Sequence, residues 1–245
     1  MKRPIDRRSG VALWRQVADR IRLGIAGGSL GADGRLPPEI ALAQTFGVNR
    51  HTLRTAIASL VDEGVLRAEQ GRGTFVESRR RIAYPIAART RFSTGLRGQA
   101  ESHTSRLIAH AEEPADSIVS EHLALRLGGA VVRLETVSEA DGRPVARATA
   151  YFDAARFAGF ADAYAETLSI TAALARFSVA DYLRRSTVVS ARHADAQELT
   201  DLRLAPGAIV LFAEAVNVDL EGHPIQYSRT RFAADRVELT VVDQN

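Results

Sequence analysis

Hydrogen-bond donors and acceptors gather in the six residues from Asn49 to Arg54, which read NRHTLR. Asn49, Arg50, His51, Thr52 and Arg54 bring amide, guanidinium, imidazole and hydroxyl groups together within about two turns of a helix. Asn49 can cap a helix that begins here, because its side chain accepts an otherwise unpaired backbone N–H. Arginines in the opening turns of such a helix can form paired hydrogen bonds with guanine edges, so this segment predicts a contact with DNA in the major groove.

A single arginine between two glycines is the second candidate contact. Gln70-Gly71-Arg72-Gly73 separates two short segments rich in β-forming residues, 65–68 and 74–76, and this pattern predicts a hairpin tip. Gly71 and Gly73 let the backbone approach phosphates closely, so that Arg72 can enter a narrow, electronegative minor groove.

Apolar residues at helical spacing must position both contacts. The runs on either side of Gly47 supply one apolar face each, made of Leu42, Ala43, Phe46, Leu53, Ala56, Ile57 and Leu60. Glycine between them suits a tight turn, so the pattern predicts a helix-turn-helix, and the hairpin after it makes the unit a winged helix. Residues 13–25 predict a further helix that packs behind this motif.

The charge distribution agrees with a polyanionic partner. Residues 1–81 hold 15 basic and 8 acidic side chains, a net charge of +7, whereas residues 82–245 hold 17 basic and 21 acidic ones, a net charge of −4. A solvated basic face would give the same numbers, but a positive charge on the helix-turn-helix side favours nucleic-acid binding.

Composition excludes several classes of protein. The chain has 245 residues, 46% of them hydrophobic and 25% charged, which is enough for two domains with separate cores. It contains no cysteine, so disulfides, thiolate metal sites and cysteine nucleophiles are ruled out. No apolar run approaches the roughly 20 residues that span a bilayer, and no signal core is found, so we expect a cytoplasmic protein without a membrane partner.

The second part of the chain contains an internal repeat. Residues 105–152 predict strand, helix, strand, turn and strand, and residues 125–152 align with residues 202–232 about 80 positions later. Neither copy can bury its apolar face alone, so we expect the two to pair in one antiparallel sheet covered by helices. Residues 171–177 predict a further helix and residues 186–194 a further strand. The fold class is therefore α+β, with a DNA-binding domain at 1–77, a linker at 78–90 and a second domain at 91–245.

A pocket where the two copies meet can differ at equivalent positions. The alignment matches Arg133 with Leu211, and it matches Thr149 and Tyr151 with Arg229 and Arg231. Polar side chains in apolar strands suit a small-molecule site, although outward-facing strand residues give the same pattern. A second candidate for anion binding is the segment 89–93, RTRFS, where two arginines flank a hydroxyl, and a surface turn is the alternative.

These motifs resemble a known family. LPPE, FGVNRHTLR and LVDEGVLRAEQGRGTFV resemble the GntR family of bacterial transcription regulators, and the turns ADGRPVA and EGHPIQYS resemble the effector domain of its HutC branch, the UTRA domain, which has a chorismate-lyase-like fold. VNRHTLR together with YPIAARTRFSTGL and SHTSRL resembles the phosphonate-metabolism regulators of that branch.

The resemblance implies a repressor that binds a palindromic double-stranded DNA operator as a homodimer and leaves it when a small anionic effector binds. That effector is a phosphonate, phosphate or phosphorylated metabolite, and the controlled genes serve phosphonate uptake or catabolism. A HutC-branch regulator that senses a sugar phosphate or an amino-acid derivative is the alternative. One residue departs from the family, since Ile40 stands where many members have an arginine.

The roles carried over follow the matching positions. The DNA contacts are Arg50, His51 and Arg54 with the hairpin tip. The effector contacts, together with Tyr151 from the repeat, are Arg91, Phe92, Ser93, Arg133, Ser169 and Tyr227.

An enzyme is the alternative from another class, because the resemblance implies that the second domain shares its fold with a lyase. The six histidines show no metal-ligand spacing, and none is paired with an evident nucleophile and acid. We therefore expect no enzyme activity, no metal and no cofactor. An architectural DNA-binding protein without a sensor would leave the repeat without a purpose.

Overall fold

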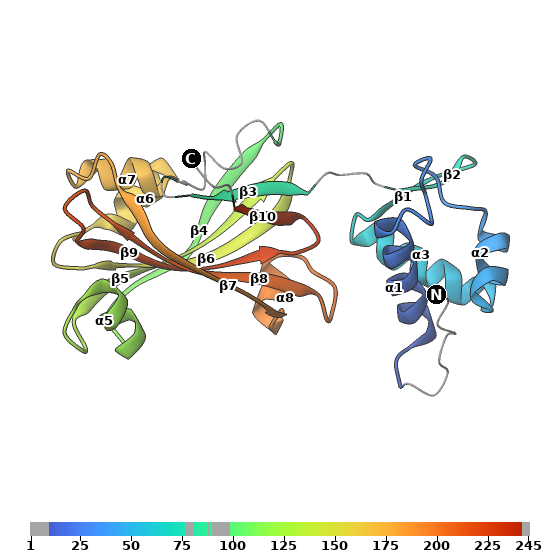
Figure 1. Ribbon diagram of the computed structural model, residues 1–245, viewed down its shortest axis with the longest axis horizontal. Coiled ribbons are helices and arrows are strands. Elements are labelled where there is room, and N and C mark those ends of the chain that lie inside the picture. Colours follow the sequence, from blue (N-terminus) through green and yellow to red (C-terminus); the bar gives the residue numbers. More distant parts are fainter. Residues whose placement is uncertain (1–9, 77–80, 88, 90–98, 242–245) are drawn as a thin grey trace. The chain divides into compact units, whose positions relative to one another are not determined.

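The computed structural model describes residues 10–76, 81–87, 89 and 99–241, and the chain divides into two compact units, Met1–Arg79 and Arg80–Asn245 (Figure 1). Each unit is described by itself. None of the helices in these residues is long and apolar enough to cross a membrane.

The first unit is the expected winged helix. It consists of α1 (Leu13–Ala26), α2 (Glu39–Phe46), α3 (Arg50–Asp62), β1 (Leu66–Glu69) and β2 (Gly73–Val76), and the two strands pair as an antiparallel hairpin. Gly47 lies between α2 and α3 with φ +64°, a left-handed conformation that glycine adopts without strain. The core joins all three helices to the hairpin through Val17, Ile21, Leu42, Leu53, Ala56, Leu60 and Leu66.

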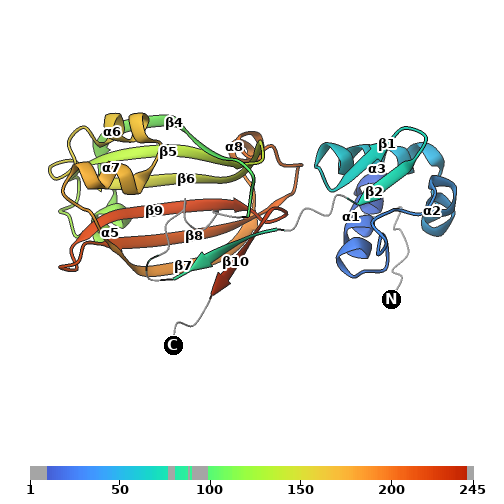
Figure 2. The same ribbon diagram turned by 90° about the horizontal axis from the view of Figure 1, so that it is seen from above.

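The second unit is built on one six-stranded antiparallel sheet. The strands are β4 (His103–Pro114), β5 (Ala130–Ala140), β6 (Arg143–Asp153), β7 (Leu183–His193), β8 (Ile209–Val218) and β9 (Pro224–Ala233), and their order in the sheet is β4-β5-β6-β9-β8-β7. Helices α6 (Phe160–Thr167) and α7 (Ile170–Arg176) cover one face, and α5 (Ser117–Leu123) and α8 (Ala196–Asp201) lie on the other (Figures 1 and 2). The α+β fold predicted from the sequence is confirmed.

The internal repeat explains this sheet. The copies are β4-α5-β5-β6 and β7-α8-β8-β9, and they join in the centre where β6 pairs with β9. Thr149 lies opposite Arg229, its counterpart in the repeat, so the two copies are related by a local two-fold axis through this pair. The expected single sheet formed from both copies is therefore present.

Part of the expected linker is a strand. Ile82–Ile86 forms β3, which pairs in parallel with β10 (Val237–Val241) and belongs to the second unit. Ile82 and Tyr84 are buried in a core cluster with Val237, and the Tyr84 ring lies 5.0 Å from that of Phe232. The arginines before this segment and Pro85 within it hid the alternation of buried residues that marks a strand.

Candidate functional site

In the opening turns of α3, some polar side chains stabilise the helix end and others are exposed to a partner. The side chain of Asn49 accepts the N–H of Thr52 at 2.7 Å, so Asn49 caps the helix as expected, and Thr52 is half-buried. Arg50, His51 and Arg54 are exposed. The opposite side of α3 is fixed in the core, so these three side chains have a rigid support and open access to a partner.

Arg54 is paired with an acidic side chain of the preceding helix. Its Nε donates to Oε2 of Glu39 at 3.1 Å, and the two side chains keep 72% and 39% of their surface exposed. Such an exposed pair is weak, so it orients the Arg54 guanidinium without preventing its exchange onto a nucleic-acid partner.

The wing tip carries the second candidate contact. Gly71 and Gly73 have φ of +74° and +112°, and the Arg72 side chain between them is 77% exposed while its Nη1 lies 2.9 Å from Glu69. A Cβ at Gly73 would come within 3.0 Å of the Arg35 guanidinium, so glycine also leaves room for that side chain.

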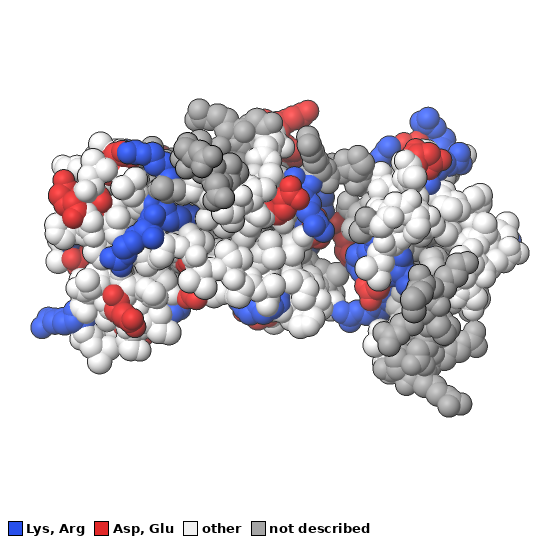
Figure 3. All heavy atoms as spheres, viewed as in Figure 1, with Lys and Arg blue, Asp and Glu red and all other residues white. Residues whose placement is uncertain are grey.

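Two further arginines of the wing were missed by the sequence reasoning. The guanidinium groups of Arg35 and Arg67 lie 5.7 and 5.5 Å from the ring of Phe75 on β2. Arg35 precedes the helix-turn-helix in sequence, and an antiparallel bridge between Arg35 and Phe75 brings it to the hairpin. Glu69 forms ion pairs with Arg67 and Arg72, so basic and acidic side chains lie side by side on this unit (Figure 3).

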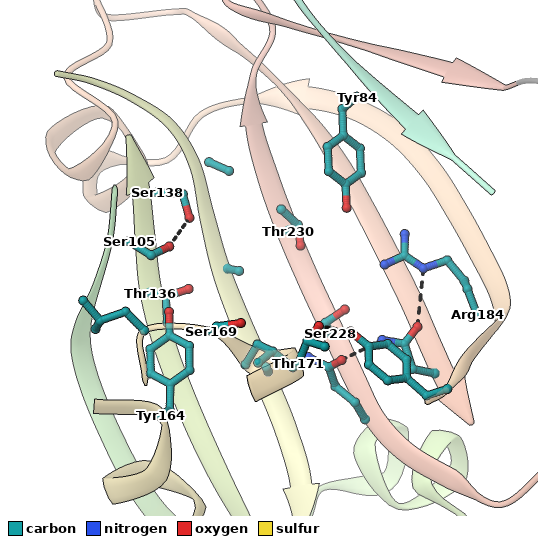
Figure 4. A pocket seen from close by; sticks show the side chains of 18 of the residues that line it. Tyr84, Ser105, Thr136, Ser138, Tyr164, Ser169, Thr171, Arg184, Ser228 and Thr230 are labelled. Carbon is teal, nitrogen blue, oxygen red and sulfur yellow. Dashed lines mark hydrogen bonds between the residues drawn. The ribbon is translucent and has the colours of Figure 1, made fainter. Parts of the chain in front are cut away.

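The second unit contains a cavity of about 110 Å³ on the sheet face that α6 and α7 cover (Figure 4). A cavity of roughly 10–15 Å³ holds one water, so this one has room for a small metabolite. Its polar lining comes from β3, β4, β5, β7, β8, β9 and the helices, with Tyr84, Ser105, Ser138, Tyr164, Ser169, Arg184, Asn217 and Gln226.

The expected effector residues do not all lie on the same face of the sheet, because side chains alternate along each strand. Ser169 lines the cavity, and its side chain caps α7 by accepting the N–H of Ala172 at 3.3 Å. Arg133, Tyr151 and Tyr227 instead lie on the opposite face of the sheet, because the cavity takes the neighbouring positions of β5, β6 and β9. Arg91, Phe92 and Ser93 lie outside the described residues.

The face opposite the cavity is closed by its own ion pairs. Arg133 donates to Glu113 at 3.0 Å and also pairs with Glu135. Tyr227 is fully buried, stacks on His122 at 4.4 Å between ring centroids, and donates its hydroxyl to Glu214. Burial, followed by this hydrogen bond, raises the pKa of Tyr227 to about 12. Arg133 and Tyr227 therefore already have partners within the protein.

Burial keeps the hydroxyl groups of two cavity residues, Tyr84 and Tyr164, in the neutral form. Burial raises the pKa of Tyr84, with the adjacent Arg184 acting in the opposite direction, and burial also raises the pKa of Tyr164 against hydrogen bonds with Ser105 and Thr136. Burial lowers the pKa of His103, which lines the same cavity. At neutral pH the cavity therefore presents neutral hydrogen-bonding groups around the Arg184 guanidinium.

Acidic and histidine side chains do not form a metal centre in the described part of the chain, since no group of three or more could hold an ion there.

Comparison with known proteins extends the resemblance over almost the whole chain. The model of the bacterial regulatory proteins, gntR family, matches residues 13–76, and the UTRA domain model matches residues 98–238. An HTH-type transcriptional regulator of Rhizobium meliloti (strain 1021) is 52% identical over 97% of both chains. The "probable transcriptional regulator PhnF" of Escherichia coli (strain K12) is 33% identical over 84% of this chain and 85% of its own.

Solved structures support the same fold. The crystal structure of PhnF from Mycobacterium smegmatis superposes with a TM-score of 0.63 at 24% identity, over 93% of this chain and 99% of that one.

Proposed function

Since the chain belongs to the GntR family of bacterial regulatory proteins, in the branch that carries a UTRA domain, and is a DNA-binding transcriptional regulator rather than an enzyme, we propose that it is an effector-controlled repressor. In this proposal α3 reads an operator, and a small anionic molecule in the cavity of the second unit weakens that binding. The resemblance to phosphonate-metabolism regulators makes genes for phosphonate uptake or catabolism the proposed targets.

The observation that carries the DNA contact is the exposure of Arg50, His51 and Arg54 on the opening turns of a helix whose other side is buried. Each guanidinium that pairs with a guanine discriminates against a wrong base by about 1–3 kcal/mol. Arg72 at the wing tip adds a contact in the minor groove, where a narrow groove attracts cations.

A homodimer follows from the proposed operator. Two copies of α3 can occupy successive major grooves only when the half-site centres lie about 10 base pairs apart, or a multiple of this distance. An inverted-repeat operator is therefore proposed together with the two-fold symmetric dimer.

Effector binding controls the proposed repressor by population shift. A ligand that binds more tightly to the state in which the two α3 helices do not fit one operator lowers DNA affinity by the ratio of its two affinities. The cavity supports this proposal because it is lined by polar groups and is closed on one side by the sheet that both repeat copies build.

Selection of bound duplexes from a random DNA pool tests this function. We expect enrichment of an inverted repeat, and we expect binding to the enriched duplex to weaken when a small phosphonate is added. Recovery of no common sequence would refute operator binding. An enriched operator whose affinity responds to none of the phosphonates, phosphate or sugar phosphates would refute the effector-controlled part.

A further inference from the structure

The two ends of the cavity carry different chemistry. At one end, the arginine end, hydrogen bonds link Arg184 with Tyr84 and Asn217, and Asn217 with Gln226. At the other, the hydroxyl end, lie Ser105, Thr136, Ser138 and Tyr164. Figure 4 shows Tyr84 and Arg184 on one side and the Ser105–Ser138 pair with Thr136 and Tyr164 on the other. The cavity therefore presents a charge at one end only, as far as its described lining shows.

This polarity follows from divergence of the two repeat copies. Ala146, Ala148 and Ala150 of β6 line the cavity, and their counterparts 80 residues later in β9 are Gln226, Ser228 and Thr230. The local two-fold axis thus relates a floor of methyl groups in the first copy to amide and hydroxyl groups in the second. A ligand in such a cavity has one preferred direction.

Arg184 differs from the arginines on the other face of the sheet. Its Nε lies 3.4 Å from Oδ1 of Asn217, and its guanidinium lies beside the Tyr84 hydroxyl. Within the described residues no carboxylate forms an ion pair with Arg184. By contrast, Arg133 and Arg147 on the opposite face contact Glu113 and Asp201 at 3.0 and 2.8 Å. A guanidinium whose neighbours in the cavity are neutral can accept an anion without first breaking an ion pair with a carboxylate.

The hydroxyl end is neutral and already connected by hydrogen bonds. The hydroxyls of Ser105 and Ser138 lie 2.6 Å apart, and Tyr164 from α6 lies beside Ser105 and Thr136. Hydroxyl groups both donate and accept, so this end suits a ligand hydroxyl and gives no counter-charge for a second acidic group.

We propose that Arg184 binds the acidic group of the effector, and that the effector is a small molecule with one acidic group at one end and a hydroxyl at the other. This inference rests on the proposed function, because it takes the cavity to be the effector site. In this proposal Arg184 is required for binding of any acid, and Ser138 with Ser105 gives the preference for an acid that carries a hydroxyl.

Four matched probes test the two ends with the full chain. They are 2-hydroxyethylphosphonate, ethylphosphonate without the hydroxyl, 3-hydroxypropionate with a carboxylate in place of the phosphonate, and 1,3-propanediol without a charge. Isothermal titration calorimetry should rank the hydroxylated acids first, ethylphosphonate next and the diol last. The order of the phosphonate and the carboxylate identifies the acidic group. If wild-type protein binds neither hydroxylated acid, or binds the diol equally well, the assignment is wrong.

Two arginine variants and one serine variant locate the contacts. Arg184→Gln should weaken binding of both hydroxylated acids about ten- to a hundredfold, the range expected for loss of a charge-assisted hydrogen bond. Arg185→Gln removes the same charge at the next residue, which is exposed and is not among the described residues that line the cavity, and should leave binding within about twofold. Ser138→Ala should remove the preference for 2-hydroxyethylphosphonate over ethylphosphonate. Equal losses in the two arginine variants would overturn the role of Arg184.

The same proteins separate this inference from the proposed function. DNA binding is followed by fluorescence anisotropy with the selected operator while the acids are added. If an acid binds through Arg184 but operator affinity stays constant, the effector-controlled repressor fails and the binding assignment stands. If an acid releases the operator equally from wild type and Arg184→Gln, the binding assignment fails and the repressor stands.

Discussion

Replacing Arg50 by alanine should remove specific operator binding while leaving the fold intact. Arg50 is the first residue of α3 and is exposed, and the helix keeps its cap because Asn49 still accepts the N–H of Thr52. Exposed substitutions away from caps and ion pairs usually change the free energy of unfolding by less than about 0.5 kcal/mol. The substitution should therefore change DNA binding without changing the stability of α3.

The expected loss is large because the proposed dimer uses Arg50 twice. At about 1–3 kcal/mol for each paired contact with guanine, two contacts contribute about 2–6 kcal/mol, or a loss of about 30-fold to 10⁴-fold in operator affinity. Affinity for a scrambled duplex should fall much less, since non-specific binding depends on the total number of phosphate contacts.

Fluorescence anisotropy with the selected operator and a scrambled duplex, both at one salt concentration, measures this prediction. Arg126→Ala is the matched control, because it removes the same charge from an exposed position after α5 in the second unit. If the Arg50 variant keeps its unfolding temperature and also keeps its preference for the operator, the reasoning about α3 is refuted.

Three further predictions concern a helix cap and two sets of ion pairs in the two units. Asn49→Ala should lower the free energy of unfolding of the first unit by about 0.5–2 kcal/mol in urea titrations, because α3 loses its cap; no change would contradict the capping role. Glu39→Gln should leave stability within about 0.5 kcal/mol but release Arg54 to phosphates, so that affinity for a scrambled duplex rises and its salt dependence steepens; an unchanged salt dependence would count against this. Glu198→Gln should lower the stability of the second unit by about 3–5 kcal/mol at pH 7, because the fully buried carboxylate pairs with two arginines. Burial opposes ionisation of Glu198, but its hydrogen bonds and those arginines hold its pKa below the usual value. This contribution is therefore complete above a pH of about 4.3 and disappears as pH falls through the lower folded-state pKa. A deficit that stays equally large in urea titrations when the pH is lowered from 7 to about 2 would contradict it.

The winged helix was predictable because its signals are local. Gly47 is needed for a left-handed turn, Asn49 accepts a backbone N–H three residues later, and the glycines of the hairpin tip adopt positive φ. Each of these depends on residues close in sequence, and the apolar face of α3 then fixes the register of the helix against the core.

The residues that line the cavity were harder to predict, because the cavity face of the sheet has a weak sequence signal. Large polar residues such as Arg133 and Tyr227 were predicted to contact the effector. They lie on the face opposite the cavity, where Arg133 forms an ion pair and Tyr227 stacks on another ring. The cavity face is marked by alanines, serines and threonines, which ordinary strands also contain. Arg184 lies at the start of an edge strand, beside a bulge that interrupts alternation, so periodicity could not assign it to a face.

The strands β3 and β10 show a second limit of sequence patterns. Five residues of each strand pair in parallel although about 150 positions separate them in sequence, and their burial depends on Phe232 from β9. No turn or repeat links these segments, so the charged residues before Ile82 made a linker the natural interpretation.

Amide hydrogen exchange of the full chain with and without the selected operator tests whether α3 and the wing bind DNA under control of the cavity. Operator DNA should slow exchange at residues 50–54 of α3 and at the wing tip, 70–73, and an acid bound in the cavity should reverse this protection. Slowed exchange confined to other segments, with α3 and the wing unchanged, would contradict it.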